Sequence, residues 1–150
     1  MPNTRQKGNQ LQNWVEAYLK KKGYIVHNQK PVASQIKTKV GDLIWVSKRN
    51  DIYGCIDIEY FHPEEDCIHY AQVTGHSGVG KKLKDLSKIP WNSACIVELW
   101  LSKGQGRWVI KRLYGIDYTR TMGIKNEPRL EDYAEIHRGK FMLLKEELPF

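Results

Sequence analysis

The residues best suited to chemistry lie in one acidic stretch, residues 51–74, which contains six Asp or Glu residues and no Lys or Arg. Two segments with the alternating pattern of strands flank a four-residue loop at 63–66. In the register that this loop sets, Asp57 lies directly opposite Gln72, with Cβ atoms about 4.5–5.5 Å apart. Two oxygen-bearing side chains at that separation can both reach one hard cation. The stretch therefore predicts a site for a divalent metal ion.

Positive charge surrounds this acidic stretch. The chain has 150 residues and a formal net charge of +7. Residues 1–50 carry ten Lys or Arg against two acids, and residues 76–125 carry ten against three. Basic flanks attract phosphates, while an acidic centre attracts a divalent cation, so the segregated charge predicts nucleic-acid binding beside a metal ion. The alternative is ordinary solvated surface charge around an acidic hairpin tip.

Helices are expected on both sides of the acidic stretch. Apolar side chains at helical spacing predict a helix that ends at Gly23, and a basic helix is predicted over residues 81–89 after a Gly-rich loop. Residues 115–150 are expected to be a poorly defined C-terminal extension, with a short helix near 130–137.

Strand patterns occupy much of the chain before residue 115. The predicted strands lie at 24–29, 42–47, 55–61, 67–74, 94–102 and 107–114. Residues 31–41 have little pattern and are expected to be a loop. Because no internal repeat or linker interrupts the chain, the sequence predicts one α/β domain over residues 1–150, with a central mixed sheet flanked by helices.

The segments "NDIYGCIDI" and "YAQVT", residues 50–58 and 70–74, resemble the core of PD-(D/E)XK nucleases, the restriction-endonuclease-like group that includes archaeal Holliday junction resolvases. In that family an Asp follows a Gly-containing turn. An acidic residue, any residue and a Lys follow on the next strand, and the first helix often adds a Glu. The resemblance covers about residues 5–102 and implies a core of the order α-β-β-β-α-β.

The resemblance assigns roles to individual positions. Asp57 matches the family's Asp, Gln72 its acidic position and Thr74 its Lys, while Glu16 matches the helical Glu. It implies that Mg²⁺, or Mn²⁺, is held by Asp57, Gln72, Glu16 and the carbonyl of Val73. The implied activity is that of a metal-dependent endonuclease, a phosphodiester hydrolase acting on duplex or branched DNA.

Two positions depart from the family pattern. Gln72 keeps a ligand oxygen but contributes no negative charge, and Thr74 lacks the ammonium of the family's Lys. Lys81 or Lys82, at the start of the following helix, is expected to supply that ammonium. The departures leave a second function open, in which the same fold binds nucleic acid, or serves as a partner subunit, without catalysis.

Basic side chains from both helices are expected to contact the DNA backbone. These residues are Arg5, Lys7, Lys81, Lys82 and Lys84. Trp91, which follows a proline, is expected to be exposed and to stack on a base. A homodimer is a further expectation that the sequence leaves open.

Other residues compete for the metal site. Asp42 also enters an apolar strand, but the residues after it match the family poorly, so the sequence favours Asp57. Structural zinc is an alternative with these candidate ligands: Cys55, His62, Cys67, His69 and His76. Their spacing contains none of the tight pairs typical of zinc sites and does not favour zinc.

Cysteine content and hydropathy suggest a compartment. The three cysteines form an odd set without CxxC spacing, which favours a reduced, intracellular protein. The N-terminus has no apolar signal core, and no apolar run approaches the ~18 residues of a membrane-spanning helix. The sequence therefore predicts a cytoplasmic protein without a membrane partner.

Overall fold

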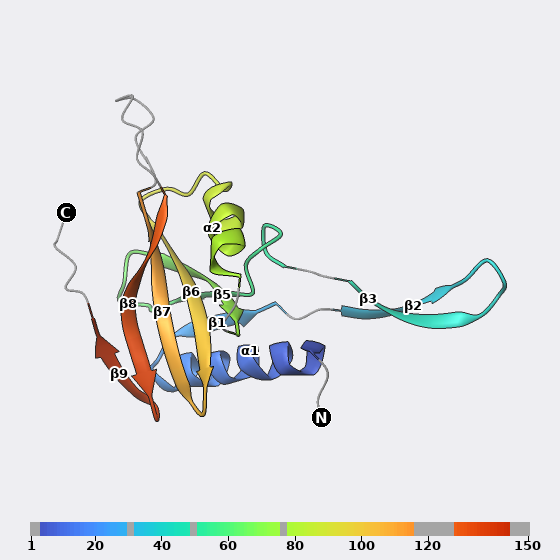
Figure 1. The fold of residues 1–150 in the computed structure, drawn as a ribbon, viewed down its shortest axis with the longest axis horizontal. Coiled ribbons are helices and arrows are strands. Elements are labelled where there is room, and N and C mark those ends of the chain that lie inside the picture. Colours follow the sequence, from blue (N-terminus) through green and yellow to red (C-terminus); the bar gives the residue numbers. More distant parts are fainter. Residues whose placement is uncertain (1–3, 30–31, 49–50, 76–77, 116–127, 145–150) are drawn as a thin grey trace.

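A computed structural model describes residues 4–29, 32–48, 51–75, 78–115 and 128–144. Within these ranges it is an α/β structure with two helices, α1 (Thr4–Lys21) and α2 (Val79–Ser87), which are shown in Figure 1. The strands are β1 (Ile25–Asn28), β2 (Val32–Lys37), β3 (Leu43–Lys48), β4 (Ile58–Phe61), β5 (Ile68–Thr74), β6 (Cys95–Gly104), β7 (Arg107–Tyr114), β8 (Arg129–His137) and β9 (Lys140–Leu143). In this part of the chain neither helix is long and apolar enough to cross a membrane.

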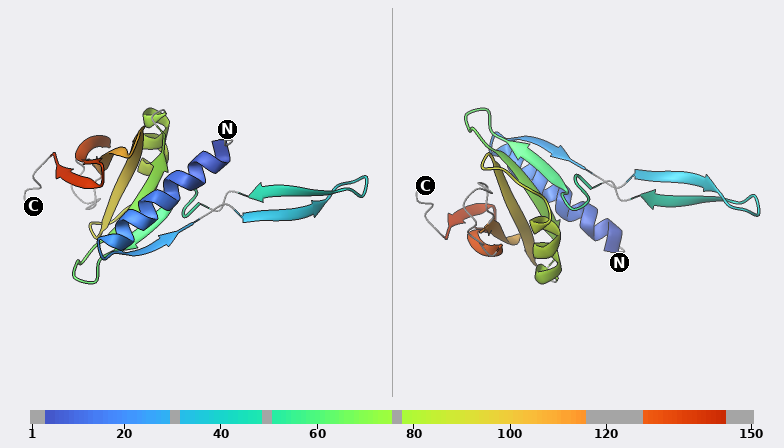
Figure 2. Two further views of the ribbon diagram at one scale, coloured as in Figure 1. Left: turned by 90° about the horizontal axis from the view of Figure 1, so that it is seen from below. Right: turned by 90° about the horizontal axis from the view of Figure 1, so that it is seen from above.

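Seven of the described strands form one mixed sheet in the order β1-β4-β5-β6-β7-β8-β9. Only β5 and β6 run parallel, because α2 carries the chain back between them, and the other neighbours are antiparallel. The mixed sheet and the 94–114 hairpin expected from the sequence are confirmed. The remaining pair, β2 and β3, forms a separate antiparallel hairpin that projects from the rest of the described structure (Figures 1 and 2).

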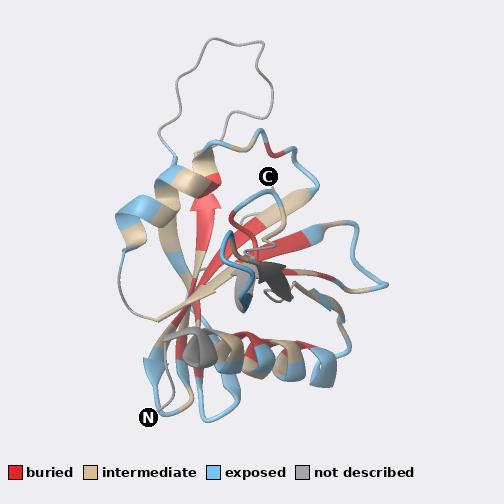
Figure 3. Cartoon of the chain, turned by 90° about the vertical axis from the view of Figure 1, so that its right-hand side faces the viewer, coloured by how far each residue is buried: buried red, intermediate tan, exposed pale blue. Residues whose placement is uncertain are grey.

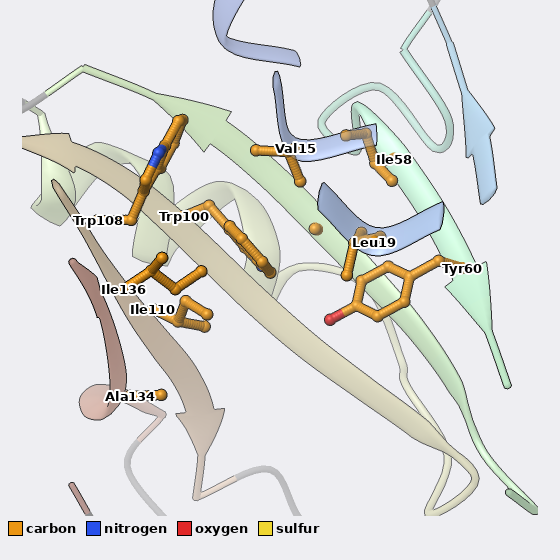
Figure 4. Packing of buried hydrophobic residues seen from close by; sticks show 10 residues of the cluster. Val15, Leu19, Ile58, Tyr60, Trp100, Trp108, Ile110, Ala134 and Ile136 are labelled. Carbon is orange, nitrogen blue, oxygen red and sulfur yellow. The ribbon is translucent and has the colours of Figure 1, made fainter. Parts of the chain in front are cut away.

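The two helices cover opposite faces of the sheet, as Figure 2 shows. Val15 and Leu19 of α1 point into a core cluster that includes Ile58 and Tyr60 of β4 (Figure 4). The helix ends where Gly23 adopts φ 93°, a conformation that favours glycine, and Tyr24 N–H then donates to the carbonyl of Leu19. Buried residues gather along the strands and on the side of α1 that faces them (Figure 3).

Leu19→Ala is expected to lower the free energy of unfolding by about 2–5 kcal/mol, because the Leu19 side chain is almost fully buried between α1 and the sheet. Leu43→Ala is the matched control, since that leucine is 63% exposed, and should change stability by no more than about 0.5 kcal/mol. Urea unfolding of both variants measures the difference. Equal losses would contradict the placement of α1 on this face.

Residues 31–41 are not all loop, as the sequence suggested, because Val32–Lys37 forms strand β2. The strand pairs with β3 in an antiparallel register from Val32↔Lys48 to Lys37↔Leu43. Its backbone pairs with β3 along one edge, and within the described ranges it joins no larger sheet. A strand in an isolated hairpin needs no buried face. Apolar and polar residues therefore need not alternate along it, and its sequence resembles that of a loop.

The short helix expected near 130–137 is also wrong, because these residues form β8. Ala134 and Ile136 are buried in the core cluster, whereas the intervening Glu135 and the following His137 are not. This is the period of a strand, and β8 continues the sheet between β7 and β9. Residues 129–143 are therefore well-formed strands, while residues 116–127 lie outside the described ranges.

Trp91 is buried, which contradicts the expectation of an exposed stacking residue. Its ring lies 4.9 Å from the ring of Tyr70, and its Nε1 donates to the carbonyl of Leu86 at 2.8 Å. The residue closes the core beneath α2, together with Leu86 and Val97. A tryptophan whose only polar group is bonded to backbone in this way is a packing residue.

Candidate functional site

The acidic hairpin has the register expected from its loop length. Ile58 pairs with Ala71, Glu59 with Tyr70 and Tyr60 with His69. Asp57 directly precedes β4, and its N–H donates at 3.0 Å to the carbonyl of Ala71, the residue that already pairs with Ile58. The regular register therefore ends at Ile58, and Asp57 lies beside Ala71, the residue before Gln72.

The Asp57 carboxylate is nearly buried, with 8% of the residue exposed. Its Oδ2 accepts the backbone N–H of Val73 at 2.8 Å. Because β4 begins only at Ile58, a side-chain oxygen takes the place that a strand carbonyl would hold in a longer ladder. A hydrogen bond from a backbone amide to a carboxylate is strong and fixes the carboxylate beside Gln72.

Gln72 directly precedes Val73 on β5. Its Oε1 is buried and accepts no hydrogen bond from the residues that the structure describes. A buried carbonyl without a hydrogen-bond donor destabilises the folded protein by about 1–3 kcal/mol. A hard cation bound between Asp57 and Gln72 would satisfy it, and these oxygen donors suit Mg²⁺ or Mn²⁺.

Glu16 lies on the face of the sheet that α1 covers. Its Oε1 accepts from Asn28 Nδ2 at 3.3 Å, and its Oε2 is 3.4 Å from Lys20 Nζ. Asn28 pairs with Ile58 of β4, the residue after Asp57. Glu16 therefore contacts β1 at the position that neighbours this end of β4.

The basic residues expected to contact DNA divide between the two helices. Thr74, two residues after Gln72 on the same face, ends β5, and α2 begins soon afterwards at Val79. Lys81 and Lys84 of α2 are exposed and Lys82 is half-buried. Ligands in α/β sheets commonly bind at the carboxyl ends of parallel strands, where α2 begins here. The other two residues, Arg5 and Lys7, lie on α1, and their side chains are outside the described set.

Asp42, the competing aspartate, lies in the turn that joins β2 to β3. Its carbonyl accepts the N–H of Thr38 at 2.8 Å, and the residue is exposed. Because the β2–β3 hairpin projects from the rest of the described structure, Asp42 lies apart from the acidic hairpin (Figure 1).

A second polar centre lies on the α1 side of the sheet, in a pocket of about 570 Å³ whose walls include Tyr24 and Tyr133. Its deepest charge is Glu98, which is 2% exposed. The Glu98 carboxylate accepts from the Tyr60 hydroxyl, from Trp100 Nε1 at 3.3 Å and from Arg112 Nε at 3.2 Å. A buried charge must be paired in this way to be stable.

The charges of this centre hold one another in their ionised forms. Burial by itself would raise the pKa of Glu98, but His69 and Arg112 outweigh it and lower that pKa to about 2. Burial would likewise lower the pKa of His69, whereas Glu98 and Glu65 raise it above its ordinary value. His69 Nδ1 is 3.5 Å from Glu98, and its Nε2 is 3.0 Å from Glu65.

The same histidine belongs to a possible metal-binding group. The ligand atoms of Glu65, Cys67 and His69 lie within 4.8 Å of one another, and they form the one such group among the described residues. Cys55 is buried on the opposite face of the sheet, and His76 lies outside the described ranges. The sequence suggested Cys67 and His69 as ligands but not Glu65. A signal was present, because Glu, Cys and His, three residue types that bind metals, stand at alternate positions here.

Glu98 and Arg112 were also missed. The signal for Glu98 was a single acid within the apolar run "CIVELWL". Arg112 had none, because only the pairing of β6 with β7 places it opposite Glu98.

No family model, curated protein or solved structure matches this chain. Its function is therefore argued from the geometry of the two centres.

Proposed function

We propose that the protein is a metal-dependent endodeoxyribonuclease that hydrolyses phosphodiester bonds of duplex or branched DNA. The observation that carries the proposal is that the Asp57 carboxylate accepts the N–H of Val73, next to Gln72, whose buried Oε1 accepts no hydrogen bond from the described residues. A carboxylate and an amide carbonyl oxygen together would form a donor set for a hard cation.

The arrangement of the elements supports a restriction-endonuclease-like core. When the β2–β3 hairpin is set aside, the chain runs α1-β1-β4-β5-α2-β6, which is the order α-β-β-β-α-β. The three strands before α2 are antiparallel neighbours, and β6 lies parallel to β5. The family resemblance of "NDIYGCIDI" falls on the segment that leads into β4, and that of "YAQVT" falls on β5.

In the proposed reaction each of these residues has its own role. Asp57, Gln72 and the carbonyl of Val73 would hold Mg²⁺, and Glu16 would add negative charge from α1. When bound, the metal stabilises charge on the phosphate and lowers the pKa of a bound water. The Val73 N–H keeps the Asp57 carboxylate oriented.

Groups beyond the metal ligands position the substrate. The Thr74 hydroxyl can orient water beside Gln72, because the two side chains share one face of β5. Lys81, in the first turn of α2, would contact the phosphate. Lys82 and Lys84 extend the same contact along the DNA backbone.

A second function, nucleic-acid binding without catalysis, is favoured by the same two positions that depart from the nuclease pattern. Gln72 brings no negative charge to the metal, and Thr74 cannot replace an ammonium. A protein of this kind would bind DNA or RNA, or serve as a partner subunit, through the same basic surface.

Cleavage assays separate the two functions. Purified protein is incubated with supercoiled, linear, branched and single-stranded DNA in Mg²⁺, Mn²⁺ or EDTA. We expect cleavage with either metal and none in EDTA. If the wild type is inert with each metal while Gln72→Glu combined with Thr74→Lys gains cleavage, the binding function holds instead.

DNA affinity is expected to fall steeply with salt, because Lys side chains release counterions from phosphates. Reversing Lys81, Lys82 and Lys84 to Glu should weaken binding of all sequences alike. It should also reduce the slope of log K against log salt by about 0.9 for each phosphate that the variant no longer neutralises. Fluorescence anisotropy over a salt series measures both quantities.

Lys88→Glu is the control for Lys81→Glu. Lys88 is also exposed, but it follows the last turn of α2, whereas Lys81 is in the first turn. The two variants carry the same charge change, so a larger loss of affinity with Lys81→Glu locates the DNA at the start of α2. Binding that does not depend on salt would overturn both nucleic-acid functions.

A further inference from the structure

We propose that Glu65, Cys67 and His69 form a binding site for Zn²⁺ or a related transition-metal ion, separate from Asp57 and Gln72. The proposal does not depend on nuclease activity. Glu65 and His69 line the pocket on the α1 side, whereas Gln72 follows Ala71 of the α1-side core cluster on β5 and so faces the other side of the sheet.

The spacing of the three ligand atoms fits one tetrahedral ion. Zn²⁺ binds N and O at about 2.0–2.2 Å and S at about 2.3 Å, so tetrahedral ligand atoms are separated by about 3.3–3.7 Å. The observed separations are 3.0 Å from His69 Nε2 to Glu65 Oε2, 3.6 Å from Cys67 Sγ to Glu65 Oε2 and 3.7 Å from Cys67 Sγ to His69 Nε2. An ion can enter this triangle with shifts of a few tenths of an ångström.

The histidine is already oriented as a metal ligand. His69 is nearly fully buried, and its Nδ1 faces Glu98 Oε2 at 3.5 Å, which leaves Nε2 for the ion. Glu98 is itself fixed by Arg112 and Tyr60. Metal-ligating histidines commonly direct their second nitrogen to a carboxylate in this way, which fixes the tautomer and the ring.

Strand geometry aligns the other ligands. Cys67 directly precedes β5 and His69 is the second residue of that strand, so the two side chains leave the same face. Glu65 reaches back from the β4–β5 loop, and Tyr24 donates to its Oε1 at 3.3 Å. Two of the three ligands therefore lie at the start of β5, and the third, Glu65, is held in place by the hydroxyl of Tyr24.

Ligand type and charge select the ion. Thiolate and imidazole suit Zn²⁺ and related transition metals, whereas Mg²⁺ requires oxygen donors. With Cys67 as a thiolate, the negative charges of Glu65, Cys67 and Glu98 balance those of a dication and Arg112, so no net charge is buried. Three protein ligands leave a fourth position for water or a ligand.

Co²⁺ titration tests the site, because a thiolate ligand gives a charge-transfer absorption and tetrahedral coordination gives intense visible bands. We expect the charge-transfer band to saturate at one Co²⁺ per chain and to disappear when Zn²⁺ displaces the cobalt. Cys67→Ser should remove the charge-transfer band, and Glu65→Gln should weaken binding at least tenfold. Circular dichroism confirms that each variant is folded.

Cys95→Ser is the matched control, since Cys95 is a partly buried cysteine whose thiol bonds Asn92 instead. It should keep the full cobalt spectrum, and so should Asp57→Asn, which separates this site from the proposed nuclease site. The proposal is overturned if no stoichiometric Co²⁺ or Zn²⁺ binding occurs. It is also overturned if the thiolate band survives Cys67→Ser.

Discussion

Asp57→Asn is expected to lower Mg²⁺-dependent DNA cleavage by about a thousandfold or more, because it removes the ionised ligand of the metal and with it several kcal/mol of transition-state stabilisation. The amide oxygen of Asn can still accept the Val73 N–H, so the local fold should persist. DNA affinity should stay equal or rise, since a carboxylate no longer repels the phosphate. Single-turnover cleavage and anisotropy measure the two effects.

Two further variants make this result specific. Asp57→Ala leaves the Val73 N–H without its acceptor and should cost about 1–3 kcal/mol of stability in addition to activity. Asp42→Asn, in the β2–β3 turn, should cleave like the wild type. Undiminished cleavage in Asp57→Asn together with loss in Asp42→Asn would transfer the catalytic role to Asp42.

Glu98→Gln is expected to lower the free energy of unfolding by about 3–5 kcal/mol, because it leaves the buried charges of Arg112 and His69 without their central counter-ion. The substitution preserves the volume of the side chain, so the loss of stability comes from changes in charge and hydrogen bonding and not from packing. Urea unfolding in EDTA measures it without any contribution from bound metal.

Asp132→Asn is the control for this experiment. Its carboxylate pairs with Lys111 across β7 and β8 but is 54% exposed, so the same chemical change should cost no more than about 1 kcal/mol. A loss below about 1 kcal/mol for Glu98→Gln would show that the buried network is no more important than a surface ion pair.

The sequence alone determined the features that depend on near neighbours along the chain. The loop at 63–66 is short enough to set the register of β4 and β5, so the pairing of Ile58 with Ala71 followed from counting residues, whereas Asp57 departs from that register. The same locality gave α1 and its end at Gly23, because apolar spacing and a glycine cap act within a few turns. Burial of Trp91 was missed, because its partners Tyr70 and Val97 come from β5 and β6.

Only the tertiary structure decided which distant residues meet. Glu98, His69 and Arg112 come from β6, β5 and β7, and the parallel pairing of β5 with β6 that brings two of them together depends on the α2 crossover. In β8 the buried side chains of Ala134 and Ile136 alternate with less buried residues. The sequence nevertheless predicted a helix, because the backbone partners that make this segment a strand belong to β7. Long-range strand pairing is set by packing and hydrogen bonds between segments far apart in the chain. No local pattern therefore encodes the buried charge network, whereas the Glu65–Cys67–His69 group beside it lies within five consecutive residues.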